Sequence, residues 1–115
     1  MVPIRDWLKK QPDKVQVKCL AYIAHLEATG HDLRRPVADF LRDGIYELRP
    51  SYQGVNYRIL YFFAGKNVVV VSHGFTKLGS RMPDAEIDKA IERKKKFATD
   101  PAAYAYKPAQ SGRHS

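Results

Sequence analysis

Three basic side chains and a histidine stand where this sequence could do chemistry on a phosphate. Arg58 lies inside the apolar run Tyr57 to Phe63, so it calls for a partner or a ligand. His73 closes a run of valines, and Lys77 and Arg81 follow it in a segment flanked by glycines. Phosphodiester cleavage needs groups that move protons and cations that offset the charge of the transition state. These residue types therefore indicate chemistry on a phosphodiester.

The same residues also have structural interpretations. Glu47 and Arg49 share one face of the preceding extended segment, so Glu47 could pair with Arg58 or with Arg49 and leave no role for a ligand. His73 could be a half-buried residue at a strand end that makes a single hydrogen bond. Spacing alone leaves both interpretations open.

Other catalytic motifs are missing from the sequence. His25, His31, His73 and His114 lack the spacing of metal ligands, and the single cysteine excludes an internal disulfide or a thiol-rich zinc site. That cysteine, Cys19, falls on an apolar helix face and is most simply a core residue. Glycine-rich phosphate loops and the nucleophile elbow of hydrolases are also lacking. We therefore expect no metal and no cofactor.

Aromatic side chains could add stacking faces for nucleotide bases. Most aromatics at strand spacing belong to a core, so we expect one or two of the candidates to be exposed, and we assign Tyr61 to RNA binding. The candidates are Tyr52, Tyr57, Tyr61, Phe62 and Phe63.

The chain is strongly basic. Its 115 residues carry 20 Lys and Arg against 12 Asp and Glu, a formal net charge of +8, and most of the excess lies in the first and last thirds. Such a charge favours nucleic acid, an acidic protein or an anionic membrane surface as partner, although a solvated, soluble surface explains it equally well. No apolar run is long enough to cross a membrane and no signal peptide opens the chain, so we expect a cytoplasmic protein without a membrane partner.

Helical spacing marks three segments. Ile4, Trp7 and Leu8 begin a short helix, Pro12 starts a second that ends at Gly30, and a third runs from Pro83 to Asp100. The second helix has Val15, Cys19, Tyr22, Ile23 and Leu26 on its apolar face, and the third has Ile87, Ala90, Ile91 and Phe97.

Strand-forming residues occupy the middle of the chain, at 45–49, 57–63 and 68–72. A turn is predicted at Asp43-Gly44, before the first of them, and residues 50–56 have the composition of a turn. Alternation along 57–63 places Arg58, Leu60 and Phe62 on one face of the strand. Short turns join the strands, which predicts an antiparallel meander of at least three strands because parallel pairs need long crossovers. We expect residues 31–43 to form a packed connector and residues 74–83 a loop. The fold class is α+β: N-terminal helices packed on a small antiparallel sheet, with a C-terminal helix. Residues 1–98 form one domain, and residues 99–115 are predicted to be a flexible tail.

In their order along the chain, the sequence segments described above resemble those of the toxins of the RelE/ParE superfamily. The resemblance is strongest to the HigB-like, phage Gp49-like branch of type II toxin–antitoxin systems. The resemblance covers about residues 3–97, and its helix end and connector match at Leu26, Glu27, Gly30, Leu33 and Pro36. The blocks that carry it are Gly44 to Arg49, Tyr57 to Phe63, His73 to Lys77, Pro83, and Glu86 with Ile87.

The resemblance implies a RelE-like fold and a ribosome-dependent, metal-independent mRNA endonuclease that inhibits translation. A cognate antitoxin, often of helix-turn-helix type, would hold it inactive. By this resemblance Arg58 stabilises phosphate and transition-state charge, and His73 transfers a proton. Lys77 and Arg81 stabilise the backbone or leaving group, and Arg49 matches an RNA-binding arginine of the first strand block.

Two departures from the family pattern leave alternatives open. Relatives usually carry a β-strand before the segment that matches Ile4; here either the sheet lacks that strand or the strand lies upstream of Met1. Their lysine-rich loop is here Lys77 and Leu78 with a later Arg81, one cation fewer. The alternatives are a ParE-like inhibitor of DNA gyrase and a catalytically inactive relative that binds an antitoxin or nucleic acid.

Overall fold

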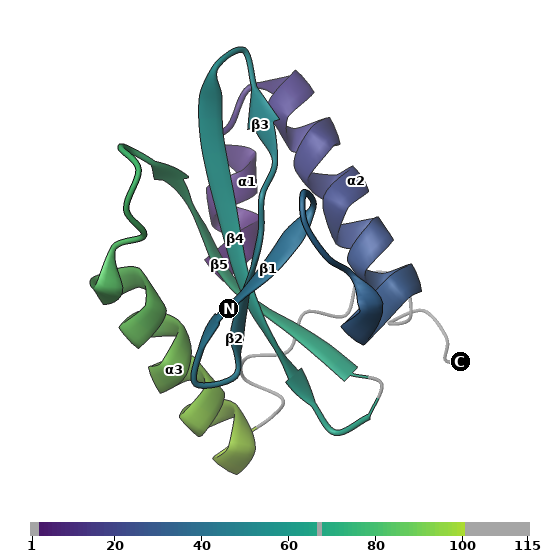
Figure 1. The fold of residues 1–115 in the computed structure, drawn as a ribbon, viewed down its shortest axis with the longest axis vertical. Helices are drawn as coiled ribbons and strands as arrows, with labels where there is room; N and C mark the ends of the chain where they lie inside the picture. The colour runs from purple at the N-terminus through teal and green to yellow at the C-terminus, as the bar shows by residue number, and fades with distance from the viewer. Residues whose placement is uncertain (1–2, 67, 101–115) are drawn as a thin grey trace.

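The computed structural model of the protein describes residues 3–66 and 68–100. Their order is helix, helix, five strands, helix, which confirms the α+β class (Figure 1). The elements are α1 (Pro3–Lys9), α2 (Asp13–Thr29), the 3-10 helix η1 (Gly30–Asp32), β1 (Ala38–Arg42), β2 (Ile45–Leu48), β3 (Ser51–Tyr52), β4 (Val55–Ala64), β5 (Val68–Lys77) and α3 (Asp84–Thr99). Of the predicted tail, residues 101–115 lie outside the described residues.

All strand pairs in the sheet are antiparallel. β1 pairs with β2, β2 with β4, and both β3 and β5 pair with β4. The predicted meander of β2, β4 and β5 is confirmed, and two strands join it that the sequence did not indicate. The connector predicted at residues 31–43 is therefore wrong in part, because it contains the edge strand β1.

Two tight turns shape the hairpins. Asp43 and Gly44 have φ angles of 53° and 79°, and Gln53 and Gly54 have 50° and 81°. Two successive positive φ angles are the requirement of a type I′ turn, whose twist matches that of the flanking strands. The first turn was predicted. The second makes the segment 50–56 a hairpin between β3 and β4, where only a turn was expected.

β5 is longer than predicted, so His73 has a different place in the strand from the one expected. The strand runs to Lys77, so the expected loop at residues 74–83 begins only at Leu78, and His73 lies within the strand instead of at its end. Leu60 pairs with His73 and Tyr61 with Val71, so Ser72 is an extra residue at a bulge.

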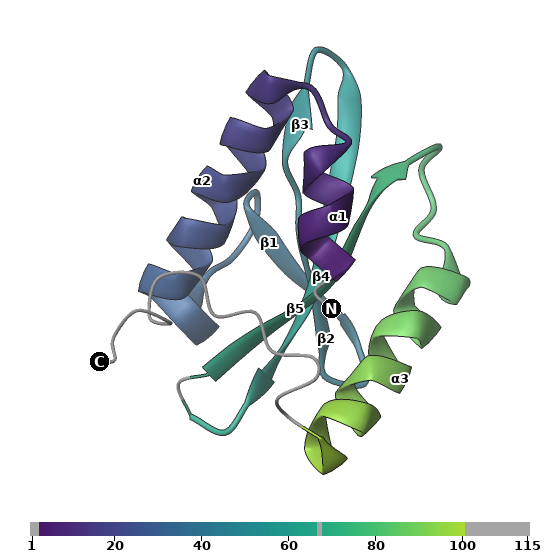
Figure 2. The same ribbon diagram turned by 180° about the vertical axis from the view of Figure 1, so that it is seen from behind.

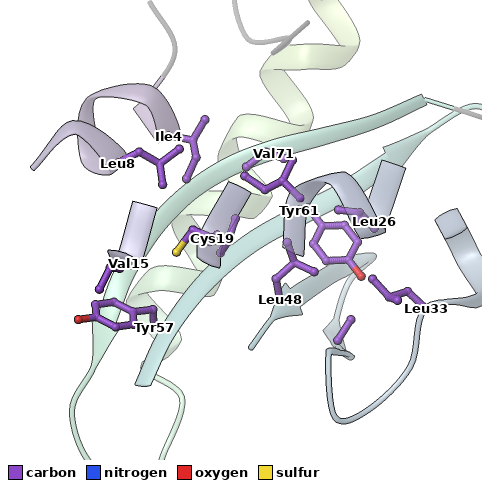
Figure 3. Close-up of a cluster of buried hydrophobic side chains, with 13 residues drawn as sticks. Ile4, Leu8, Val15, Cys19, Leu26, Leu33, Leu48, Tyr57, Tyr61 and Val71 are labelled. Atoms are coloured by element: carbon purple, nitrogen blue, oxygen red, sulfur yellow. The ribbon is translucent and has the colours of Figure 1, made fainter. Parts of the chain in front are cut away.

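One face of the sheet is covered by α1 and α2 (Figure 2). Their predicted apolar faces are confirmed, and Cys19 is a buried core residue whose burial raises the pKa of its thiol to about 11. Figure 3 shows this cluster against Leu48, Tyr57, Tyr61 and Val71 of the strands.

The opposite face is covered by α3 over only part of its length. Leu60 and Phe62 point to it, as the alternation along β4 predicted, and pack with Ile45, Val70, Ile87 and Ala90. Glu86 in the first turn of α3 contacts His73, and Phe97 near its end contacts Phe62. The helix thus runs back along β5, away from Lys77. Beyond its first turn the second core cluster ends at Phe75 and Met82, which pack against it and are only partly buried.

Candidate functional site

The register places the predicted cations on the face that α3 leaves partly open. Residues directly paired across antiparallel strands share a face. Leu60 pairs with His73, Arg58 with Phe75, and Asn56 with Lys77. Arg58, His73 and Lys77 therefore project from the same side of β4 and β5, in three successive rows. They are not in mutual contact, since the structure gives each a different partner.

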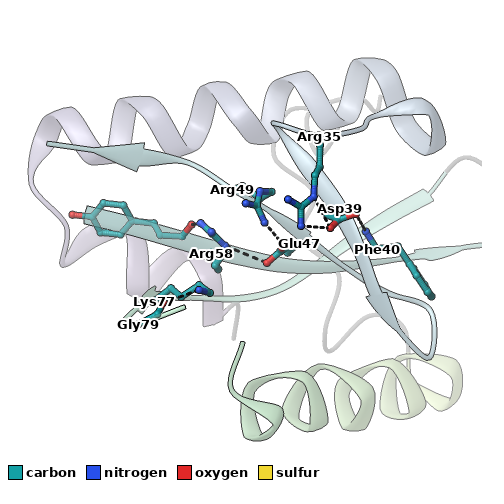
Figure 4. Close-up of polar contacts among 9 residues, drawn as sticks. Arg35, Asp39, Phe40, Glu47, Arg49, Arg58, Lys77 and Gly79 are labelled. Carbon is teal, nitrogen blue, oxygen red and sulfur yellow. Dashed lines mark hydrogen bonds and ion pairs between the residues drawn. The ribbon is translucent and has the colours of Figure 1, made fainter. Parts of the chain in front are cut away.

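Arg58 is held in a buried cluster with Glu47 and Arg49 (Figure 4). Arg58 Nε lies 3.2 Å from Glu47 Oε1, and Arg49 donates a 2.7 Å hydrogen bond to Glu47 Oε2. The Arg58 and Glu47 side chains are only 6% and 4% exposed, and that of Arg49 is 23% exposed. Both pairings left open by the sequence therefore exist at once, with one carboxylate between two guanidinium groups.

The buried pair has unused hydrogen-bonding capacity. Arg58 Nε and Glu47 Oε1 have no hydrogen-bond partner among the described residues, because their close approach is not aligned for one. Arg58 also donates from Nη1 to the carbonyl of Tyr57 at 2.8 Å. Burial lowers the pKa of Arg58, while the charge of Glu47 opposes that change and the charge of Arg49 adds to it. A guanidinium nevertheless stays protonated in proteins, so a cation is fixed beneath the open face.

A second arginine–carboxylate pair extends the cluster to the sheet edge. Arg35 contacts Asp39 of β1 at 2.8 Å, and Asp39 pairs in register with Glu47. Burial raises the pKa of Asp39, but the hydrogen bonds from Arg35 and the Phe40 amide lower it by more, so this pKa lies below its usual value. Three arginines thus surround two carboxylates, so the cluster carries an excess of positive charge.

His73 lies between two side chains at the base of α3. Its Nδ1 is 2.8 Å from Ser72 Oγ, and its Nε2 is 2.9 Å from Glu86 Oε1. Burial lowers the pKa of His73 to about 4, with the charge of Arg93 adding to this and the hydrogen bond to Glu86 opposing it. The imidazole is therefore neutral near pH 7.

A neutral ring with these partners has one consistent tautomer. Nε2–H donates to the Glu86 carboxylate and Nδ1 accepts from the Ser72 hydroxyl. Neither ring nitrogen is then free to take a proton from a substrate. The Ser–His–Glu order is that of a hydrolase triad, but Ser72 is buried, so its hydroxyl is not presented to a substrate. In this conformation the three residues join β5 to α3.

Two further predicted cations are accessible. Lys77 at the end of β5 donates from Nζ to the carbonyl of Gly79 at 2.8 Å, in an exposed position. Arg81 is exposed in the loop that follows. Lys77 lies one row beyond the buried Arg58 on this face, and Arg35 and Arg49 pair with the carboxylates of Asp39 and Glu47 on the same face.

Tyr61 lies on the other face, away from these cations. It is 1% exposed, packs under α2 in the main core, and burial raises the pKa of its phenol. The prediction that Tyr61 binds RNA does not fit this position, because alternation puts it on the helix-covered face. Of the other aromatic candidates, Tyr52 and Phe63 are half-buried, and Tyr57 and Phe62 are buried.

Among the described residues, the exposed Phe, Tyr or Trp side chain is that of Phe40, in the unpredicted strand β1. The described residues contain no group of three or more His, Cys, Asp or Glu side chains placed to hold a metal ion. No helix in the same part of the chain is long and apolar enough to cross a membrane.

Fold and site together define a small α+β protein with a cationic, partly open sheet face. A family model described as "Phage derived protein Gp49-like" matches residues 6–95. The chain belongs to this family, which is one of RelE/HigB-like toxins. A comparison with curated proteins gives no match.

Proposed function

We propose that this protein is the toxin of a type II toxin–antitoxin system and cleaves mRNA on the ribosome without a metal. The observation that carries the proposal is the set of cations Arg35, Arg49 and Lys77 on the same sheet face as the buried Arg58, with Arg81 exposed in the loop that follows β5. Family membership adds support, since Gp49-like proteins are toxin-like. A cognate antitoxin and the mRNA-loaded ribosome are the partners.

In this proposal the reaction is attack by a ribose 2′-hydroxyl on the adjacent phosphate. The new bond joins the 2′-oxygen to phosphorus, and the bond to the 5′-oxygen breaks. The 2′-hydroxyl gives its proton to solvent water and the leaving 5′-oxygen takes one from solvent water, so the products are a cyclic phosphate and a free 5′-hydroxyl. Arg49 and Arg58 offset the charge that gathers on the non-bridging oxygens. Lys77 and Arg81 hold the flanking phosphate and the leaving 5′-oxygen.

His73 takes the proton-transfer role only if Glu86 releases Nε2. With its pKa at about 4 and both ring nitrogens occupied, the described arrangement makes it a positioning residue for α3. A proton-transfer role then predicts that Glu86→Gln, which weakens that contact, raises cleavage. A positioning role predicts that it lowers cleavage and loosens α3.

The test is cleavage of one mRNA, free in solution and on programmed ribosomes. We expect cleavage only on ribosomes, reduced at least about tenfold in Arg49→Gln and in Lys77→Gln. Lys14→Gln is the matched control, because Lys14 is exposed on α2, which covers the opposite sheet face. No cleavage by the wild-type protein in either setting contradicts the proposal, and DNA breaks that depend on gyrase would replace it with a ParE-like function.

The antitoxin should neutralise or cover the same face. We expect an acidic contact surface that reaches Arg49 and Lys77. Binding of the antitoxin should weaken when both are changed to Gln and should be unaffected by Lys14→Gln. An antitoxin insensitive to the double variant binds elsewhere on the protein.

A further inference from the structure

A cavity of about 350 Å³ lies at the edge of the sheet, on the side opposite Arg58. Its walls include His31, Arg34, Asp39, Phe40 and Tyr46. Phe40 of β1 pairs with Tyr46 of β2, which pairs with the core residue Tyr61, so these rings belong to the helix side of the sheet. The cavity occupies the part of that side between η1 and the edge strand. The proposed catalytic role uses none of its rings.

The aromatic walls are fixed by ring contacts behind them. Phe40 is 53% exposed and meets Tyr46 edge-on, with ring centres 5.1 Å apart. Tyr46 in turn stacks on Tyr61 at 5.4 Å and meets Phe63 edge-on at 5.3 Å. His31 stacks on Phe63 with ring centres 3.6 Å apart. An exposed ring held by core neighbours keeps a flat face toward solvent without the entropy cost of ordering it on binding.

The charges at the rim suit an anionic ligand. Arg34 is exposed and donates from Nη1 to the carbonyl of His31 at 2.8 Å, which holds the guanidinium beside the cavity. The carboxylate of Asp39 is paired with Arg35, so its charge is offset. Aromatic faces next to an arginine are the combination that binds single-stranded nucleic acid, since bases stack and phosphates pair with the cation.

We propose that this cavity binds a base of a single-stranded RNA, stacked on Phe40, with the adjoining phosphate at Arg34. The proposal rests on the proposed function for the identity of the ligand. The residues of one segment connect the two sites: Arg35 pairs with Asp39 in the cationic cluster, Arg34 and Phe40 line the cavity, and Asp39 belongs to both. Figure 4 shows the Phe40 ring directed away from the Arg58–Glu47 pair. An RNA strand leaving Arg49 reaches the cavity by crossing the β1 edge.

The test measures binding without cleavage. The probe is a fluorescein-labelled single-stranded RNA with 2′-O-methyl groups throughout, which lacks the attacking hydroxyl, and the readout is fluorescence anisotropy. Phe40→Ala should raise the dissociation constant at least about fivefold, whereas Phe40→Trp should restore or strengthen binding. Phe40 is exposed, so we expect both variants to fold, and circular dichroism checks this.

Two controls make the result specific. Leu20→Ala changes an exposed apolar residue on α2 that is not part of the cavity, and should leave binding unchanged. A version of the probe with abasic sites should bind the wild-type protein more weakly, and Phe40→Ala should remove that difference. Equal affinity of the wild-type protein and Phe40→Ala overturns the proposal, as does a wild-type protein that binds both probes alike.

The outcomes separate this proposal from the proposed function. Unchanged RNA binding by Phe40→Ala with intact ribosome-dependent cleavage removes the base site and leaves the nuclease. Binding that depends on Phe40 in a protein that cleaves no mRNA leaves an RNA-binding protein with no nuclease activity.

Discussion

Glu47 is the residue that organises the candidate site. Its carboxylate is bound on both oxygens by arginines, and one of these, Arg58, has almost no exposed surface. Removing one member of a buried pair leaves an uncompensated charge, and this costs more than the pair itself contributes. Loss of activity in an Arg58 variant would therefore mix catalysis with folding.

We expect Arg58→Met to lower the free energy of unfolding by about 3 kcal/mol, because Glu47 keeps only Arg49 as partner. The double variant Glu47→Leu, Arg58→Met should recover most of that loss, since no buried carboxylate remains. Urea denaturation of the single and double variants measures both values. A double variant less stable than Arg58→Met would mean that the pair itself stabilises the fold.

The second prediction at this scale concerns pH and His73. Its pKa is lowered in the folded protein to about 4, so between that value and its ordinary pKa the unfolded chain binds the extra proton. Stability contributed by the neutral ring is therefore fully present above about pH 6.5 and is lost progressively as the pH falls toward 4.

The loss between pH 7.5 and pH 5 should be about 2 kcal/mol for His73 alone. Urea denaturation at the two pH values measures it, and His73→Gln serves as the control that lacks the titrating ring. The difference between wild type and variant isolates His73 from the exposed histidines. An equal loss in both proteins would show that His73 does not titrate in this way.

At the scale of elements, the sequence predicted those helices and strands whose apolar residues are regularly spaced. The three helices and the centres of β2, β4 and β5 follow from apolar spacing, and the Asp43-Gly44 turn from its residue types. β1 was missed because Asp39 and Phe40 do not alternate as a half-buried strand does: the charged residue faces the arginine cluster and the aromatic one is exposed. A strand at the edge of a sheet is determined by its partner more than by its own pattern.

The end of β5 was misplaced for a different reason. From the sequence, Gly74 was predicted to begin a loop. It lies in the strand instead, at a position where a Cβ would collide with the indole ring of Trp7. The glycine is therefore explained by the close approach of α1 and not by turn geometry.

The third prediction follows from that contact. Gly74→Ala should lower the free energy of unfolding by about 1–3 kcal/mol through overpacking. In a Trp7→Leu background the cost should shrink, giving a coupling above about 0.5 kcal/mol in a double-mutant cycle. Thr76→Ala, at an exposed position of the same strand, is the control. Independent effects of the two substitutions would show that α1 does not depend on this contact.

The candidate site was predictable in part. The spacing of Glu47, Arg49 and Arg58 was enough to propose both ion pairs, because residues two apart share a strand face. The partners of His73 were not predictable, since the bulge at Ser72 and the start of α3 meet only in three dimensions. The same holds for Phe40, whose role depends on a cavity built from η1, β1 and β2.

At the scale of the whole molecule, the net charge of +8 is less informative than its distribution. In α3 the acidic residues lie mainly in the first half and the lysines at 94–96 lie near the C-terminus, where they complement the helix dipole. By contrast, Arg35, Arg49 and Lys77 come from separate segments and lie on one face of the sheet, and Arg81 follows in the next loop. A charge excess that serves solubility alone has no reason to gather in this way.

This distinction predicts how RNA binding depends on salt. Each phosphate paired with a cation releases counterions, so the logarithm of the binding constant falls with the logarithm of the salt concentration. Four contacts on single-stranded RNA give a slope of about −3, taking about 0.7 for each phosphate. We expect Lys77→Gln or Arg81→Gln to make the slope shallower by about 0.7, while Lys14→Gln, on α2, leaves it unchanged. Anisotropy titrations of the 2′-O-methyl RNA from 50 to 200 mM salt, about the range over which such slopes are resolved, provide the measurement. If the salt slope becomes shallower by the same amount in all three variants, RNA binds non-specifically to the whole surface, and the open sheet face is not the binding site.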